Sequence, residues 1–114
     1  MKKRAFATLA VFSILSIGLS SEALALRMSD LAKLVGYTIV YSGYVTGYAN
    51  EDGSSRRDGD FEGCDYGRKI FVDDRYAFTC ASYSYSYAYH PKVVVLSNGS
   101  SVKLIINDVI YDVR

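Results

Sequence analysis

The sequence predicts a mainly β domain, built as a small antiparallel and strongly curved sheet or SH3-like barrel with one short N-terminal helix after a signal peptide. Two observations favour this fold. From Tyr37 onward the chain is rich in tyrosine, valine, isoleucine, threonine and glycine and has a single proline, which is the composition of strands and turns. Two turn dipeptides near the C-terminus then place the apolar residues around them on one face of a sheet.

The first 25 residues have the three-part layout of a secretory signal peptide. Three basic residues at positions 2–4 precede a largely apolar run from Ala5 to Leu19, and small and polar residues then lead to Ala23 and Ala25. The run is shorter than the roughly 20 apolar residues of a membrane-spanning helix, so we expect cleavage after Ala25 and no membrane insertion of the mature chain. We expect a bacterial protein that is periplasmic or secreted.

The mature chain, residues 26–114, is predicted to be one small domain with little net charge. The full sequence carries 13 basic and 12 acidic residues, and cleavage leaves 10 and 11, a formal charge of −1. A nearly neutral chain argues against nucleic acid as a partner. No phosphate-binding glycine loop follows a predicted strand, so we expect no cofactor.

A short helix is predicted over residues 26–35. Leu31, Leu34 and Val35 are spaced three and four positions apart, and Gly36 suits a helix end.

One long strand is predicted next, over YTIVYSGYVTGY, residues 37–48, with a kink at Gly43 or Gly47. It is followed by NEDGSSRRDGD, residues 50–60, which contains only polar residues and glycine and is therefore predicted to be an exposed loop. The acidic residues of this loop do not follow the EF-hand spacing, so we expect no metal site there.

Two hairpins are predicted in the last third of the chain. A two-residue turn at 98–99, Asn-Gly, would pair Val95 with Val102, and a second at 107–108, Asn-Asp, would form the next hairpin. Both turns, placed independently, put the same eight side chains on one face. These are Val93, Val95, Val102, Leu104, Ile106, Val109, Tyr111 and Val113.

Cys64 and Cys80 are the only cysteines, and export to an oxidising compartment predicts that they form a disulfide. Closing this loop contributes about 3 kcal/mol in the chain-entropy model. A two-residue turn at 73–74 would place Cys80 beside Gly67, so the chain must bend at Gly63 or Gly67, or the segment FEGCDY must lie on a neighbouring strand. A thiol nucleophile or a metal pair is the alternative, although two cysteines and one histidine cannot fill a four-ligand zinc site.

The segment CASYSYSYAYHP, residues 80–91, alternates tyrosine with serine or alanine. Its tyrosines are Tyr83, Tyr85, Tyr87 and Tyr89. On a strand the four rings share one face, and continuing the alternation through Pro91 joins this face to the buried face of the last hairpins. This alternation predicts that the rings pack in the core or at its rim. The alternative is an exposed stacking platform for sugar or peptide.

Within this segment we expect two environments. Tyr83 and Tyr85 are closest to the predicted disulfide and are expected to be covered. Tyr87, Tyr89 and His90 approach a predicted corner and are the candidate ligand-binding residues.

The elements GCDYGRKI, FTCASYSYSYAYHP and LIINDVIYDV, within residues 61–113, resemble a group of small exported bacterial proteins of unknown function. That group shares a Gly-Cys-acid-Tyr element and a Cys-x-Ser-Tyr-x-Tyr-x-Tyr-x-Tyr-x-Pro element. The resemblance implies a common fold and a shared disulfide, and it implies no mechanism.

The sequence favours a non-enzymatic exported binding or structural module whose partner is peptidoglycan or an envelope protein. His90 is the only histidine, so any acid–base or serine-nucleophile scheme depends on it, and no catalytic residue is predicted. The alternatives are a secreted hydrolase or an enzyme inhibitor that uses the tyrosine-rich strand and His90, and a domain that self-associates through that strand.

Overall fold

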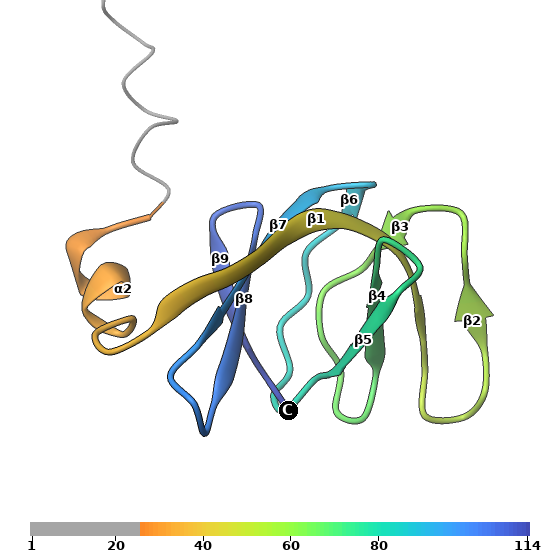
Figure 1. Ribbon diagram of the computed structural model, residues 1–114. Coiled ribbons are helices and arrows are strands. Elements are labelled where there is room, and N and C mark those ends of the chain that lie inside the picture. Colours follow the sequence, from red (N-terminus) through yellow and green to blue (C-terminus); the bar gives the residue numbers. More distant parts are fainter. Residues whose placement is uncertain (1–25) are drawn as a thin grey trace, which may run out of the picture.

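The structure is a computed structural model that describes residues 26–114 (Figure 1). The predicted signal peptide and its cleavage after Ala25 lie outside the described residues. In residues 26–114 the fold is mainly β and antiparallel with one short helix, which confirms this part of the prediction.

The elements follow one another along the chain with short connections. They are α2 (Met28–Ala32), β1 (Thr38–Ala49), β2 (Ser55–Arg56), β3 (Asp60–Phe61), β4 (Lys69–Val72), β5 (Tyr76–Thr79), β6 (Ala88–Tyr89), β7 (Lys92–Ser97), β8 (Val102–Ile106) and β9 (Val109–Val113).

The main sheet has the strand order β5-β4-β1-β7-β8-β9, and β2 also pairs with β1. β3 and β6 form a separate two-stranded sheet. Strand pairing leaves β5 and β9 at the two ends of an open path, so the strand pairs by themselves do not close the sheet into a barrel. The ends of these two strands still meet: Thr79, the last residue of β5, and Arg114, which follows β9, exchange backbone hydrogen bonds of 3.1 and 2.9 Å.

β1 is the long predicted strand, and its two halves have different neighbours. Its first half, from Thr38 to Tyr44, pairs with β7, and its second half, from Val45 to Ala49, pairs with β4 (Figure 1). The register shifts between Val45 and Gly47, at one of the two predicted kinks. At Gly47 a Cβ would collide with the backbone of Arg56 on β2, so only glycine lets β2 approach this closely.

The helix α2 is shorter than predicted. It spans five residues, none of them buried, and Leu31 is exposed. Its apolar side chains are exposed, whereas most helices in proteins are stabilised by packing of their apolar face. Gly36 follows with a φ of 87°, as expected of a residue at a helix end.

The β8–β9 hairpin has the predicted register, with Leu104 opposite Tyr111. The β7–β8 register differs, because Val95 lies opposite Leu104 and not Val102. A four-residue turn replaces the predicted two-residue turn: the Asn98 side chain accepts hydrogen bonds from the backbone of Ser100 and Ser101 and closes the wider loop. A shift of two residues keeps the same face inward, so the predicted apolar face is confirmed.

The β4–β5 turn also differs from the prediction. Val72, and not Phe71, lies opposite Tyr76, because the turn contains three residues. Asp73 and Asp74 both adopt a left-handed conformation, with φ values of 53° and 50°, and carry the chain around this wider turn.

The core lies between the sheets and is almost entirely aliphatic and aromatic. Its members are Val45, Tyr48, Phe61, Cys64, Ile70, Val72, Cys80, Val93, Val95, Leu104, Ile106, Tyr111 and Val113. Full burial of one such aliphatic or aromatic side chain contributes about 1.5–3 kcal/mol.

The Cys64–Cys80 disulfide is confirmed, with the two Cα atoms 5.5 Å apart. The chain bends at Gly63 and Gly67, with φ values of 82° and 78°. Cys64 also pairs with the neighbouring Ser84. The predicted bends at the two glycines are therefore found, whereas only Phe61 of the segment FEGCDY lies on a strand, β3.

Candidate functional site

The four tyrosines of residues 83–89, which we call the tyrosine row, lie on the surface. Tyr83, Tyr85, Tyr87 and Tyr89 are 62%, 65%, 54% and 69% exposed. The expectation that the row packs in the core, and that Tyr83 and Tyr85 are covered, is therefore wrong. The expected accessibility of Tyr87 and Tyr89 is found.

The row is exposed because the small residues between the tyrosines face inward. The row lies against the segment from Asp60 to Cys64, where Asp60 pairs with Tyr89 and Cys64 with Ser84. A Cβ on Gly63 would collide with the backbone of residues 84–86, so glycine allows this close approach. Large rings cannot fit into that contact, whereas serine and alanine can.

The predicted continuity through Pro91 fails at His90. This residue has a φ of 49°, which ends the strand-like alternation before β7 begins. Its backbone N–H donates to the Gly59 carbonyl at 2.6 Å, and Pro91 is buried. The alternation of inward and outward side chains in the row therefore does not continue into β7.

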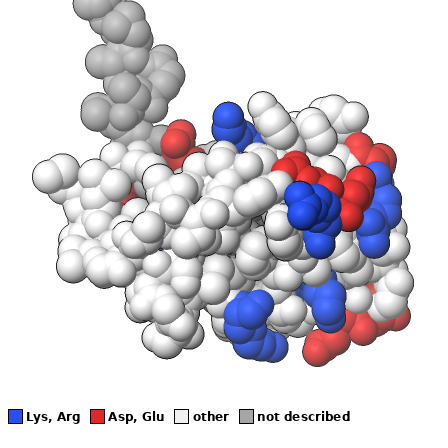
Figure 2. All heavy atoms as spheres, viewed as in Figure 1, with Lys and Arg blue, Asp and Glu red and all other residues white. Residues whose placement is uncertain are grey.

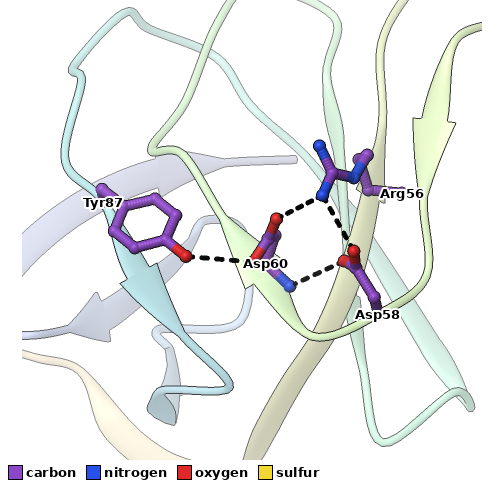
Figure 3. Close-up of polar contacts among 4 residues, drawn as sticks. All are labelled: Arg56, Asp58, Asp60 and Tyr87. Carbon is purple, nitrogen blue, oxygen red and sulfur yellow. Dashed lines mark hydrogen bonds and ion pairs between the residues drawn. The ribbon is translucent and has the colours of Figure 1, made fainter.

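Tyr87 is tied to the neighbouring loop by a network of polar contacts (Figure 3). Its hydroxyl donates to Asp60 at 3.1 Å, and Arg56 donates to Asp60 at 2.7 Å and to Asp58 at 2.9 Å. The hydrogen bond to Asp60 raises the pKa of Tyr87, and the hydrogen bond from Arg56 lowers the pKa of Asp58. The network fixes one ring of the row, because rotation of Tyr87 would break its bond to Asp60.

A polar hollow of about 280 Å³ lies beside the end of the row. It is lined by Thr46, Arg57, Asp58, Gly59, Asp74, Tyr89 and His90. In Figure 2, charged side chains gather on the side of β2, β4 and β5, whereas the part over α2 and the first half of β1 is mostly uncharged. The hollow thus combines the aromatic end of the row with charged residues of the 50–60 loop.

Aromatic stacking and ion pairing hold the walls of the polar hollow. His90 stacks on Tyr44 with the ring centroids 5.2 Å apart and nearly parallel. Arg57, which also lines the hollow, lies 3.8 Å above the Phe71 ring and donates to Asp74 at 3.2 Å.

Sequence reasoning placed Tyr89 and His90 at a site but missed its other half. Residues 50–60 are predicted to be an exposed loop and most of them are exposed, but they also contain β2 and contribute Arg57 and Asp58 to the hollow. In the sequence, acidic residues stand on both sides of Arg56 and Arg57. Opposite charges this close together in the sequence indicate local ion pairs, such as those that Arg56 forms with Asp58 and Asp60, and that signal was available.

The described residues do not assemble a metal centre or a reactive thiol. Within residues 26–114 no group of three or more His, Cys, Asp or Glu side chains is arranged to hold a metal ion. In the same range both cysteines are joined in the disulfide. None of the helices in this part of the chain has the length and apolar character needed to cross a membrane.

Comparison with known proteins gave no match: no family model fits this chain, and no curated protein or solved structure is significantly similar to it.

Proposed function

We propose that this chain is an exported, non-enzymatic binding module that attaches to a cell-wall polymer such as peptidoglycan through the tyrosine row. The observation that carries the proposal is the exposure of all four rings on one short segment. Grouped aromatic rings on a surface mark interaction sites, whereas single exposed apolar residues do not. Tyrosine suits this role because its ring stacks on apolar faces and its hydroxyl forms hydrogen bonds.

The tyrosine row also has a rigid support. The disulfide lies at its start, Gly63 allows close backbone contact in its middle, and Tyr87 is bonded to Asp60 near its end. A preorganised surface loses less conformational entropy on binding, so more of the contact energy contributes to affinity.

Export is the second part of the proposal. It is supported by the signal-peptide pattern of residues 1–25 and by a disulfide that is typical of oxidising compartments. We also propose that the chain belongs to the group of small exported bacterial proteins that elements within residues 61–113 resemble.

The framework is proposed to be an SH3-like barrel. Support comes from the backbone hydrogen bonds between Thr79 and Arg114 and from the bridge between Cys80 and Val113, which link the two ends of the sheet path. Amide exchange of Thr79 and Arg114 as slow as that of β8 would favour closure, and rapid exchange would exclude it.

Sedimentation with purified peptidoglycan tests the binding function. The exported protein should pellet with the polymer, and the double variant Tyr87→Ala with Tyr89→Ala should remain largely in the supernatant. Tyr66→Ala is the matched control, because Tyr66 is 65% exposed but lines a different hollow. A wild-type protein that stays in the supernatant, or an equal loss with Tyr66→Ala, would contradict the proposal.

A further inference from the structure

We propose that the polar hollow is a subsite for a single neutral sugar ring of the bound polymer. This inference rests on the proposed function and names the ligand chemistry of one part of the surface. It is carried by the hollow's donors, its acceptors and its aromatic wall, none of which belongs to the first three tyrosines of the row.

The polar wall of the hollow presents both donors and acceptors. Within residues 26–114 the only hydrogen bond of the Arg57 side chain goes to one oxygen of Asp74, so further guanidinium N–H groups remain for a ligand. The Thr46 hydroxyl accepts from the backbone N–H of Asp74 and can donate its own proton. Sugar hydroxyls both donate and accept, so such a mixed wall matches them better than it matches a group of one polarity.

The charge of the hollow disfavours the two simpler ligands. An anion would meet the carboxylates of Asp58 and Asp74 as well as the one guanidinium of Arg57. A bare metal ion would lack ligands, because the described residues hold no cluster of three metal-binding side chains. Arg57 is already paired with Asp74, and Asp58 with Arg56, so a neutral polar ligand disturbs no charge balance.

The aromatic wall supplies the surface that the apolar face of a sugar ring needs. Tyr89 is 69% exposed and lies beside His90, with the two ring centroids 6.1 Å apart. A Cβ on Gly59 would lie only 3.3 Å from Tyr89 and 3.4 Å from His90, so both side chains rest directly on this glycine. Gly59 is held in turn, since its N–H donates to the Thr46 carbonyl at 3.2 Å. The wall is therefore set before a ligand arrives.

The subsite is continuous with the tyrosine row, because Tyr89 belongs to both. A polymer that lies along the row would place one ring in the hollow. A short neutral oligosaccharide should then occupy the hollow even without the peptide part of the cell wall.

The test is an NMR titration of the isotope-labelled exported protein with chitotriose, a neutral trisaccharide of N-acetylglucosamine. We expect amide shifts at Thr46, Gly59, Asp74 and His90 that saturate together. Arg57→Gln should weaken binding by roughly tenfold, because a hydrogen bond to a charged donor is lost. Asp74→Asn should also weaken the binding of chitotriose. This variant should fold normally, since asparagine tolerates the left-handed conformation of this position.

Arg75→Gln is the matched control. Arg75 is the exposed residue next to Asp74, but its side chain lies over the Tyr76 ring, and Arg75 does not line the hollow. Its substitution should change affinity by less than about twofold, as is usual for a rim residue. An equal loss with Arg75→Gln would overturn the subsite and indicate nonspecific attraction.

The two proposals fail separately. Pelleting with peptidoglycan but no chitotriose shifts in the hollow would overturn the sugar subsite and leave the binding function in place. Saturating shifts in the hollow without any pelleting would support the subsite and contradict attachment to the polymer. Shifts confined to Tyr83, Tyr85 and Tyr87 would also overturn the subsite, because the sugar would then bind the row alone.

Discussion

The tyrosine row and the β8–β9 hairpin have the same alternating pattern but opposite orientations. In the hairpin the large residues, such as Leu104 and Tyr111, face the core. In the row the large residues face solvent, and the serines and Ala88 are partly buried. Alternation therefore assigns residues to two faces, and the packing partner decides which face is inside. The partner of the hairpin leaves room for large side chains, whereas the partner of the row, at Gly63, leaves room only for small ones.

The largest expected effect is at Phe61, which connects the two regions. Its ring is fully buried, packs edge-on against Tyr111 at 5.5 Å, and lies on β3, which pairs with β6 at the end of the row. Phe61→Ala should lower the free energy of unfolding by about 3–5 kcal/mol, because it leaves a cavity in the core. Urea unfolding followed by circular dichroism measures this loss. A loss below about 1 kcal/mol would mean that the core does not extend to β3.

The disulfide comes next, because it joins the start of the row to the segment beneath it. Replacing Cys64 and Cys80 together by serine should lower stability by about 2–5 kcal/mol, a range typical of small secreted domains. Urea unfolding of the oxidised protein and of the double variant gives the difference. Two thiols that react with an alkylating reagent in the native protein would contradict the bond itself.

Gly63→Ala tests the close contact that turns the row outward. The substitution places a Cβ against the backbone of residues 84–86 at a φ of 82°, and we expect a loss of about 1–3 kcal/mol. Gly99→Ala is the control, because Gly99 has a φ of 96° with open space around it and so isolates the cost of the backbone conformation. Equal losses at both positions would show that the contact with the row is not tight.

The stability contributed by Tyr87, near the end of the row, should depend on pH. The bond to Asp60 raises the folded pKa of Tyr87 above its usual value of about 10. Its contribution to stability is therefore complete below pH 10 and is lost as the pH rises through the folded pKa. NMR titration of the labelled ring should show this raised pKa, and Asp60→Asn should move it back toward 10. An unchanged pKa in Asp60→Asn would exclude Asp60 as the cause.

The parts of the fold that follow from local chemistry were predictable. The disulfide follows from the presence of two cysteines in a chain whose sequence predicts export, and the β8–β9 register follows from a two-residue turn between alternating apolar residues. The β7–β8 turn was not predictable to the residue, because the Asn98 side chain closes a wider loop that competes with the two-residue turn. The error does not change the predicted core, because a register shift of two residues keeps the same side chains facing inward.

The site was harder to predict than the fold because it depends on contacts between segments that are far apart in the sequence. No local sequence pattern indicates that His90 adopts a φ of 49°. Because of this one residue, the alternation of inward and outward side chains in the row does not continue into β7. Arg57 and Asp74 are 17 residues apart and meet only because β1 brings their segments together. A sequence pattern can place Tyr89 and His90 at a corner, but it cannot name the residues that face them.

The smallest expected effect is at Tyr83 and Tyr85, and it decides the comparison between the row and the hairpin. Because the two rings are 62% and 65% exposed, Tyr83→Ala and Tyr85→Ala should each change stability by no more than about 0.5 kcal/mol. Tyr111→Ala, on the inner face of β9, should cost about 3–5 kcal/mol in the same urea series. If Tyr83→Ala matched Tyr111→Ala, the row would be covered in solution, and repeating the series at lower protein concentration would show whether a second copy covers it. A small loss at Tyr83 with a large loss at Tyr111 would establish that one alternating pattern builds a surface in the row and a core in the hairpin.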